Sequence, residues 1–378
     1  MKVPVSLVRC AAYKPDELGK SLAAALELAG GLELEGQRVL LKPNILRDAA
    51  PERALSTHPE FVRAVIRYIK AAGAKRILVG DSPGVHLGDF EGRGCGIRQV
   101  VDEEGAEWAD FRSGKKEFTL QQPLIESSFQ LTNFLDQVDV VISLPKLKTH
   151  QFMFYTGAMK NLYGLIPGYA KAGLHVKYSS RDDFAKMLVD LLQVVKPHYA
   201  LMDAVIAMEG PGPGNGFPRS LGLIAASRST LALDLVASQL IGYDPYSIPT
   251  NRHALGVLDG IKGVDDFELK GLSLEEARPG QFELIGGSQR GPVSRFLMRF
   301  RLFRKLETRS RPMPKFDPEK CILCGECIAI CASRALSFAA NADRQRYVKL
   351  DESKCIRCYC CHEICPVEAI TIEEHTCH

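Results

Sequence analysis

Several features are scarce or absent in this chain of 378 residues. No run of about 18 consecutive apolar residues occurs, which predicts that no helix spans a membrane. The first residues, Met1-Lys2-Val3-Pro4-Val5, lack the long apolar stretch of a secretory signal, so we expect a cytoplasmic protein. No G-x-x-x-x-G-K-[ST] loop is present, and no motif for a flavin or a nicotinamide cofactor is found.

An excess of charge of one sign is also missing over most of the chain. The formal net charge is +3, from 48 basic and 45 acidic residues. The short segment 290–311 holds eight Lys or Arg and one Glu, a local charge of +7, so the rest of the chain sums to −4. One short basic segment is not the broad basic face of a nucleic-acid binder, and we expect no nucleic-acid partner.

Cysteine is rare in the first 300 residues, where only Cys10 and Cys95 occur, and it is crowded after them. The run Cys321-x2-Cys324-x2-Cys327-x3-Cys331 recurs as Cys355-x2-Cys358-x2-Cys361-x3-Cys365, with an offset of 34 residues at every cysteine. Metal ligation in a reducing compartment explains this crowding better than disulfides do.

The spacing predicts two 4Fe–4S clusters that share their fourth ligands, since the last cysteine of each run points toward the other cluster. Cluster one is assigned to Cys321, Cys324, Cys327 and Cys365, and cluster two to Cys355, Cys358, Cys361 and Cys331. The module resembles a bacterial-type ferredoxin over about residues 313–374, which implies two βαβ-like halves. A zinc site is the alternative, but zinc ribbons close at four ligands. Cys360 is interpreted as a bystander, and the tail His375–His378 as a frayed end.

Apolar strand-like runs alternate with amphipathic helical runs before the cysteines, which predicts an α/β domain with a mostly parallel sheet. The expected strands are 3–8, 38–41, 76–80, 138–144, 199–206 and 221–225. The expected helices are 15–28, 59–72, 182–195 and 230–241. The predicted α+β ferredoxin-like domain then follows at the C-terminus.

Polar residues follow several of these strands, where ligands bind in open α/β sheets. Lysines beyond strand ends bind carboxylate or phosphate as point charges, and a histidine moves protons near neutral pH. We predict a cleft for an anionic small molecule, with candidate catalytic or binding residues Lys42, Asn44, His58, Asp81, Lys146, Lys148, His150, Lys160 and Asn161. The alternative reading makes Lys146 and Lys148 solvated loop charges and residues 81–84 an ordinary turn. The Gly-Pro loop 210–216 is either a lid or a rigid turn.

The same stretches carry a family resemblance. K-P-N at 42–44, T-H-P-E at 57–60, G-D-S-P-G at 80–84, L-P-K-L-K-T-H at 144–150 and T-G-A-x-K-N-L-Y-G at 156–164 resemble the domain-of-unknown-function family 362 over about residues 5–245. The resemblance implies an α/β domain that is often fused to a ferredoxin module. It implies little about mechanism.

The basic segment gives the expected domain division: an α/β domain at 1–289, a basic linker at 290–312, expected to be helical, and a ferredoxin domain at 313–378. Phe296, Phe300 and Phe303 fall near helical spacing and predict an apolar stripe packed between the domains. Peripheral contact of 290–311 with anionic lipid and docking to an acidic redox partner are the alternatives.

Three functions remain open from the sequence. The first is an iron–sulfur oxidoreductase that passes electrons through two 4Fe–4S clusters, to or from an anionic small molecule in the first domain, with a redox partner protein. The second is a non-enzymatic electron carrier whose first domain docks partner proteins. The third is a regulatory or structural iron–sulfur protein.

Overall fold

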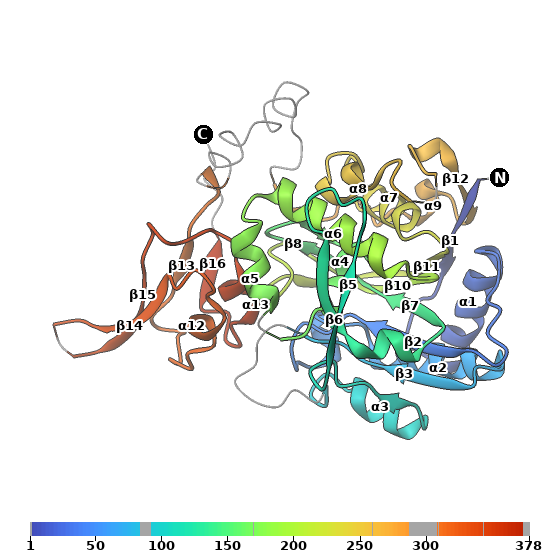
Figure 1. Cartoon of the computed structure of the whole chain (residues 1–378), viewed down its shortest axis with the longest axis horizontal. Helices are drawn as coiled ribbons and strands as arrows, with labels where there is room; N and C mark the ends of the chain where they lie inside the picture. The colour runs from blue at the N-terminus through green and yellow to red at the C-terminus, as the bar shows by residue number, and fades with distance from the viewer. Residues whose placement is uncertain are drawn as a thin grey trace.

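The computed structural model describes residues 2–83, 92–168, 170–258, 260–286, 308, 310–342 and 344–372. An α/β domain makes up the larger part, and a small α+β module from the C-terminal residues lies against one end of it (Figure 1). Most of the predicted linker 290–312, with Phe296, Phe300 and Phe303, lies outside the described residues, as does the tail from 373 onward.

The central sheet runs in the order β12-β1-β11-β10-β7-β2-β3-β4. Most neighbours in it are parallel, while β11 pairs antiparallel with both β1 and β10. The strands on this path are β1 (Val3–Arg9), β2 (Arg38–Pro43), β3 (Arg76–Val79), β4 (Glu107–Trp108), β7 (Val140–Leu144), β10 (Tyr199–Glu209), β11 (Phe217–Ser227) and β12 (Phe267–Gly271). Two further strands, β8 (Lys146–His150) and β9 (Phe154–Thr156), extend the sheet beside β10, and β5 (Lys115–Thr119) pairs with β6 (Ser128–Thr132).

Helices cover both faces of this sheet because successive strand side chains point in opposite directions. Val39 and Leu41 of β2 pack with α1 (Pro15–Leu28), α2 (Pro59–Ala71) and α3 (Ile97–Glu103). Leu40 packs with the opposite layer. That layer holds α4 (Ala158–Asn161), η3 (Leu162–Leu165), α6 (Arg181–Val195), α7 (Thr230–Leu240) and α8 (Pro249–Ala254). The shorter elements are α5 (Ala170–Lys177), α9 (Leu274–Ala277), η1 (Pro51–Arg53), η2 (Asn133–Gln137) and η4 (Val264–Asp266).

The C-terminal module repeats itself in structure as it does in sequence. Its elements are β13 (Pro314–Phe316), α12 (Glu326–Ile330), β14 (Leu336–Ala340), β15 (Arg346–Leu350), α13 (Cys360–Ile364) and β16 (Ile370–Ile372). Left-handed backbone recurs at the same offset of 34 residues, at Leu323 and Arg357 and at Gly325 and Tyr359. The two cysteine loops therefore share one backbone path, even where the second has tyrosine in place of glycine.

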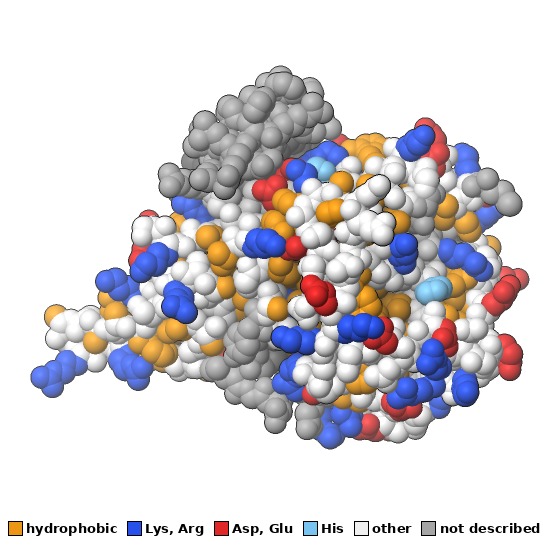
Figure 2. Space-filling model, viewed as in Figure 1, with side chains coloured by type: hydrophobic (Ala, Val, Ile, Leu, Met, Phe, Trp, Pro, Cys, Tyr) orange, Lys and Arg blue, Asp and Glu red, His pale blue; other side chains and the backbone are white. Residues whose placement is uncertain are grey.

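No helix in the described ranges is long and apolar enough to cross a membrane. On the face drawn in Figure 2, Lys and Arg side chains are interspersed with Asp and Glu over the α/β domain.

Candidate functional site

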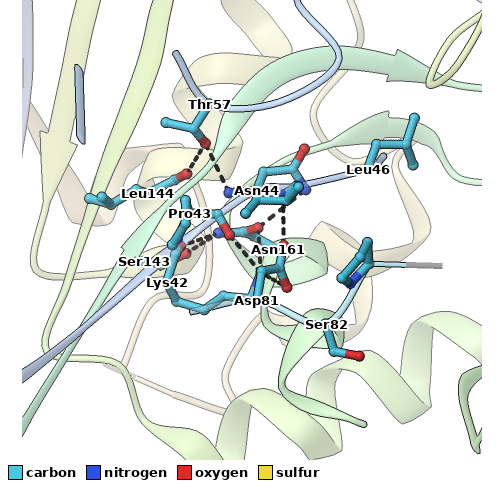
Figure 3. A network of polar contacts seen from close by, with 12 residues as sticks. Lys42, Pro43, Asn44, Leu46, Thr57, Asp81, Ser82, Ser143, Leu144 and Asn161 are labelled. Atoms are coloured by element: carbon cyan, nitrogen blue, oxygen red, sulfur yellow. Dashed lines mark hydrogen bonds and ion pairs between the residues drawn. The ribbon is translucent and has the colours of Figure 1, made fainter. Parts of the chain in front are cut away.

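A buried polar cluster lies where β2 and β3 end, and Figure 3 shows its side chains pointing toward one another. Lys42 Nζ lies 2.7 Å from Asp81 Oδ1, and both side chains are at most 2% exposed. Lys42 also donates hydrogen bonds to Pro43 O at 2.8 Å and to Asn161 Oδ1 at 3.1 Å. Asp81 Oδ2 accepts from the backbone N–H of Ile45 at 2.6 Å. The pair is thus buried with its polar atoms in contact, as buried charges require.

Asn161 and Gly164 make this close packing workable. Asn161 Nδ2 donates to Lys42 O and to Ser143 Oγ, each at 3.0 Å. A Cβ on Gly164 would lie 1.9 Å from Asp81 Oδ1 and 2.6 Å from Lys42 Nζ. Only glycine at position 164 leaves room for the ion pair, which gives a physical reason for the last residue of the T-G-A-x-K-N-L-Y-G stretch.

This cluster forms one wall of a pocket with about 670 Å³ of empty space, which we call the seam pocket because both domains line it. The α/β domain contributes the Lys42–Asp81 pair, Asn44 and Lys160, and α5 adds Lys171 and His175. The C-terminal module contributes Ile330, Cys360 and Glu363.

Burial sets the protonation of the pocket groups. It lowers the pKa of Lys160, which the charge of Glu363 partly offsets, and it lowers the pKa of Lys171 to about 7. Burial lowers the pKa of His175 to about 3, so this imidazole is neutral at pH 7. Burial raises the pKa of Glu363, against the opposing effect of Lys160 and Lys148. With a pKa of about 7, Lys171 changes its charge near neutral pH.

Five of the predicted residues line this pocket: Lys42, Asn44, Asp81, Lys160 and Asn161. Lys146 and His58 instead belong to a separate buried network around Asp203. Lys146 Nζ lies 2.9 Å from Asp203 Oδ2 and 2.9 Å from Tyr13 Oη, and Tyr13 Oη donates to Asp203 Oδ1 at 2.7 Å. His58 stacks on Tyr13 at 3.6 Å between ring centroids, and its Nδ1 caps α2 by accepting from Glu60 N. Every partner in this network is internal, which indicates a structural role.

Lys148 and His150 lie in β8, a strand buried along its whole length, so neither Lys146 nor Lys148 is a solvated loop charge. Lys148 Nζ donates to Leu55 O at 2.7 Å. His150 Nε2 lies 3.3 Å from Glu363 Oε1 of the module. Neither residue lines the pocket, but His150 contacts a residue that does. The residues that were expected to share one cleft therefore lie in separate places. Some line the seam pocket, His150 contacts Glu363 between the two domains, and Lys146 and His58 belong to the Asp203 network.

The pocket residues that were not predicted from the sequence include Lys171, His175, Cys360 and Glu363. Lys171 and His175 are four residues apart, the spacing that places two side chains on one helix face. That spacing predicts that the two side chains lie close together, but it does not indicate whether they face solvent or a pocket. Cys360, which the sequence indicates is not a cluster ligand, lines the pocket.

The cysteines of the module surround two cavities. Cys321, Cys324, Cys327 and Cys365 line one, with about 360 Å³ of empty space. Cys331, Cys355, Cys358 and Cys361 line the other, with about 350 Å³, together with Cys360. These are the two ligand sets that the crossed assignment proposes.

The donor set fits a cubane better than a single ion. Within the described part of the chain, no three His, Cys, Asp or Glu side chains are close enough to hold one metal ion. Zinc requires all its thiolates within about 2.3 Å of one centre. Backbone N–H groups also point at two of the sulfurs, from Ala335 to Cys331 Sγ at 3.2 Å and from Ala369 to Cys365 Sγ at 3.3 Å. Such hydrogen bonds are a normal feature of iron–sulfur ligation.

Polar contacts hold the module on the α/β domain. Arg311 donates to Ser179 O at 2.7 Å and to Ile356 O and Arg357 O in the second cysteine loop at 3.3 and 3.2 Å. Asn215 of the Gly-Pro loop donates to Ile370 O at 3.2 Å. A Cβ on Gly214 would lie 2.9 Å from Glu363 O. The Gly-Pro loop is thus part of the interface between the two domains.

These features define the class of protein: an α/β domain with a buried cationic pocket, joined to a 4Fe–4S module of the ferredoxin type that transfers electrons. The first part matches the family model described as a domain of unknown function, DUF362, over residues 39–239, and residues 320–369 match a 4Fe-4S dicluster domain. The chain belongs to the DUF362 family.

A curated relative supports the assignment. The chain is 36% identical over 250 residues to a thylakoid-associated protein of Synechocystis, which covers 65% of this chain and 77% of the relative. Two solved structures resemble the fold more distantly. A Thermotoga maritima protein matches with a TM-score of 0.37 and 12% identity, over 56% of this chain and 55% of its own. The lactate racemase apoprotein of Thermoanaerobacterium thermosaccharolyticum matches with a TM-score of 0.42 and 13% identity, over 62% of this chain and 56% of its own. The chain spans little more than half of either structure, and neither likeness bears on activity.

Proposed function

We propose that this chain is an iron–sulfur oxidoreductase that exchanges electrons between a redox partner protein and a small anionic molecule in the seam pocket. One observation carries the proposal. Cys360 lines both the seam pocket and the cavity of Cys331, Cys355, Cys358 and Cys361. A 4Fe–4S cluster, when bound there, supplies or accepts one electron at a time. Because electron transfer weakens steeply with distance, a shared wall favours direct exchange with a molecule in the pocket.

The pocket residues supply what such a reaction needs besides electrons. Lys160 brings positive charge to an anion, and Lys171, with a pKa of about 7, holds or releases a proton near neutral pH. Tyr163, Leu46 and Ile330 present apolar surface that excludes water. In the reducing direction the partner protein supplies the electrons and water supplies the protons, while oxidation reverses both flows.

A pocket-filling variant tests the proposal. Ala172 lines the seam pocket on α5, and Phe in its place would fill part of that space. Ala340→Phe, at an exposed position of β14, is the matched control. The cluster-loaded protein is reduced anaerobically and mixed with a panel of oxidised small anions, and reoxidation is followed by visible absorbance. We expect at least one compound to reoxidise wild type and Ala340→Phe at the same rate and Ala172→Phe at least tenfold more slowly.

The carrier function makes the opposite prediction. If no small molecule reacts while redox proteins exchange electrons equally fast with wild type and Ala172→Phe, the pocket plays no part in electron transfer and the oxidoreductase proposal is wrong.

A further inference from the structure

The unsatisfied groups of the seam pocket indicate what kind of molecule it binds. Three lysines line the pocket, and two of them already have full sets of partners. Lys42 contacts Asp81, Pro43 O and Asn161. Lys171 donates to Ser82 O, to Ser82 Oγ at 3.0 Å and to Pro83 O at 2.8 Å. An ammonium group has three donors, so neither lysine has one left for a ligand.

Lys160 is different. Across the described ranges of the chain, Lys160 Nζ makes no hydrogen bond and lies within 4 Å of no carboxylate oxygen. Lys160 is partly buried, and the nearby charge of Glu363 offsets that burial only in part. An anionic ligand in contact with Nζ would stabilise the ammonium group further. Because one lysine of the three is free, the pocket is suited to one negative charge. A second anionic group on the ligand would find no second free lysine to pair with among the residues that line the pocket.

Among the described residues that line the pocket, two neutral side chains have a buried polar atom without a hydrogen-bond partner, Asn44 at Oδ1 and His175 at Nδ1. His175 is 6% exposed, and its ring stacks on Phe184 at 4.4 Å between centroids. Asn44 Nδ2 donates to Asn161 Oδ1 at 3.3 Å, which leaves the amide oxygen as an acceptor. A ligand hydroxyl or amine that donates to either atom would satisfy it.

The remaining surface is apolar. Ile45, Leu46, Pro83, Tyr163, Ala172 and Ile330 separate these polar points. A small, fully polar anion such as phosphate would leave this surface in contact with water, whereas an apolar body would cover it and gain the free energy of burying apolar surface.

We infer that the seam pocket binds a monocarboxylate with an apolar, ring-sized body that carries one hydrogen-bond donor, with its carboxylate on Lys160 and the donor facing Asn44 or His175. This inference rests on the proposed function only for calling that molecule a substrate, since binding itself requires no electron transfer.

Calorimetric titration of the anaerobic, cluster-loaded protein tests the inference with four probes. They are 4-hydroxybenzoate, its neutral counterpart 4-hydroxybenzamide, the dianion terephthalate and inorganic phosphate. We expect 4-hydroxybenzoate to bind at least tenfold more tightly than each of the others. Tighter binding of phosphate or terephthalate, or equal binding of the neutral amide, would overturn the inference, and so would no binding of any probe.

Two substitutions of Lys160 test whether this residue binds the carboxylate of the ligand. Lys160→Gln removes the charge and should abolish the preference for the carboxylate over the amide, while Lys160→Arg should retain it. Lys270→Gln, at a lysine paired with Glu268 on the surface, is the control for charge removal and should match wild type. If Lys160→Gln is as selective as wild type, the carboxylate does not bind there. If Lys160→Gln fails to fold, its thermal unfolding transition is lost. The preference of Lys160→Arg for the carboxylate over the amide, compared with that of wild type, then decides whether the carboxylate binds at this position.

The outcomes also separate this inference from the proposed function. Selective binding of 4-hydroxybenzoate without any effect of Ala172→Phe on electron exchange would support the ligand class and reject the oxidoreductase.

Discussion

Arg47, which follows β2, donates a hydrogen bond across the domain interface to the carbonyl oxygen of Cys365, a proposed ligand of cluster one. Its second nitrogen donates to Gly214 O at 3.3 Å, and the whole residue is only 6% exposed. One buried guanidinium thus connects the end of a sheet strand, the Gly-Pro loop and a cysteine loop of the module. The position of the cluster cavities relative to the seam pocket depends on contacts of this kind.

Replacing Arg47 with Met should therefore destabilise the interface. The substitution removes the donor of Gly214 O and leaves Cys365 O with only the long contact from Glu368 N at 3.5 Å, at a cost of about 1–3 kcal/mol for each unsatisfied group. Arg38→Met is the control, because Arg38 pairs with Asp139 where both side chains are 37–43% exposed. A surface pair of this kind contributes about 0–1 kcal/mol. Anaerobic urea unfolding measures both variants, and equal losses for the two would contradict a specific role for Arg47.

The anaerobically purified protein should contain eight iron and eight sulfide per chain, since each cysteine cavity is proposed to hold one 4Fe–4S cluster. Colorimetric iron and sulfide assays on a protein quantified by amino-acid analysis give the number. Four iron per chain, or zinc in stoichiometric amount, would show that the two-cluster assignment is wrong.

The crossed ligand sets predict which cluster a single substitution damages. Cys331→Ala should impair the cluster of Cys355, Cys358 and Cys361, because Cys331 lines their cavity. Cys360→Ala is the matched control in the same cavity and should keep the full iron content, since adjacent thiolates rarely serve one cubane. Electron paramagnetic resonance of the reduced protein distinguishes the two clusters. Loss confined to the cluster of Cys321, Cys324 and Cys327 would contradict the crossed assignment.

Gly164→Ala should destabilise the protein and disturb the seam pocket. The new Cβ would lie 1.9 Å from Asp81 Oδ1, so the buried Lys42–Asp81 pair must move, and overpacking of this kind costs about 1–3 kcal/mol. Gly173→Ala is the control, because no atom lies within 4 Å of a Cβ at this exposed helical position. Alanine there should be neutral or should stabilise α5 by about 0.5–1 kcal/mol. Thermal unfolding of both variants under anaerobic conditions tests the contrast, which fails if Gly164→Ala is as stable as wild type.

Much of the fold follows from the sequence because apolar periodicity records burial. The helix 15–28 was predicted at the bounds of α1, and the strands at 38 and 76 begin where β2 and β3 do. The pattern misled at 146–150, where lysines and a histidine suggest a loop but form the buried strand β8. Their burial depends on Asp203 and Leu55 O, which are distant in the chain, and no local pattern reports such partners.

The same limit applies to the candidate site. Lys42, Asp81 and Asn161 were predicted because each lies just beyond a strand or within a motif of small residues. Glu363 and Cys360 reach the pocket only because the module packs on the α/β domain. The residues between the two domains lie largely outside the described ranges, so the contacts of Arg47, Arg311 and Asn215 are what place the module.

The last prediction concerns pH and Lys171. Burial lowers the pKa of this lysine from 10.5 to about 7 in the folded protein, while the unfolded chain keeps the ordinary value. Below pH 7 both states hold the proton, so this residue causes no pH dependence. Between about pH 7 and 10.5 only the unfolded state holds it. Because the unfolded state then binds more protons, stability rises with pH in this window.

Lys171→Met should remove that dependence. The difference in unfolding free energy between wild type and Lys171→Met should change in favour of wild type as pH rises from 7 to 9.5, by at most about 1.4 kcal/mol per pH unit for one proton. Lys270→Met, at the exposed pair with Glu268, should show no such trend. Anaerobic denaturant titrations at pH 6.5, 7.5, 8.5 and 9.5 measure all three proteins. A difference between wild type and Lys171→Met that stays constant from pH 7 upward would mean that Lys171 remains charged in the folded state, and it could then not release a proton near neutral pH.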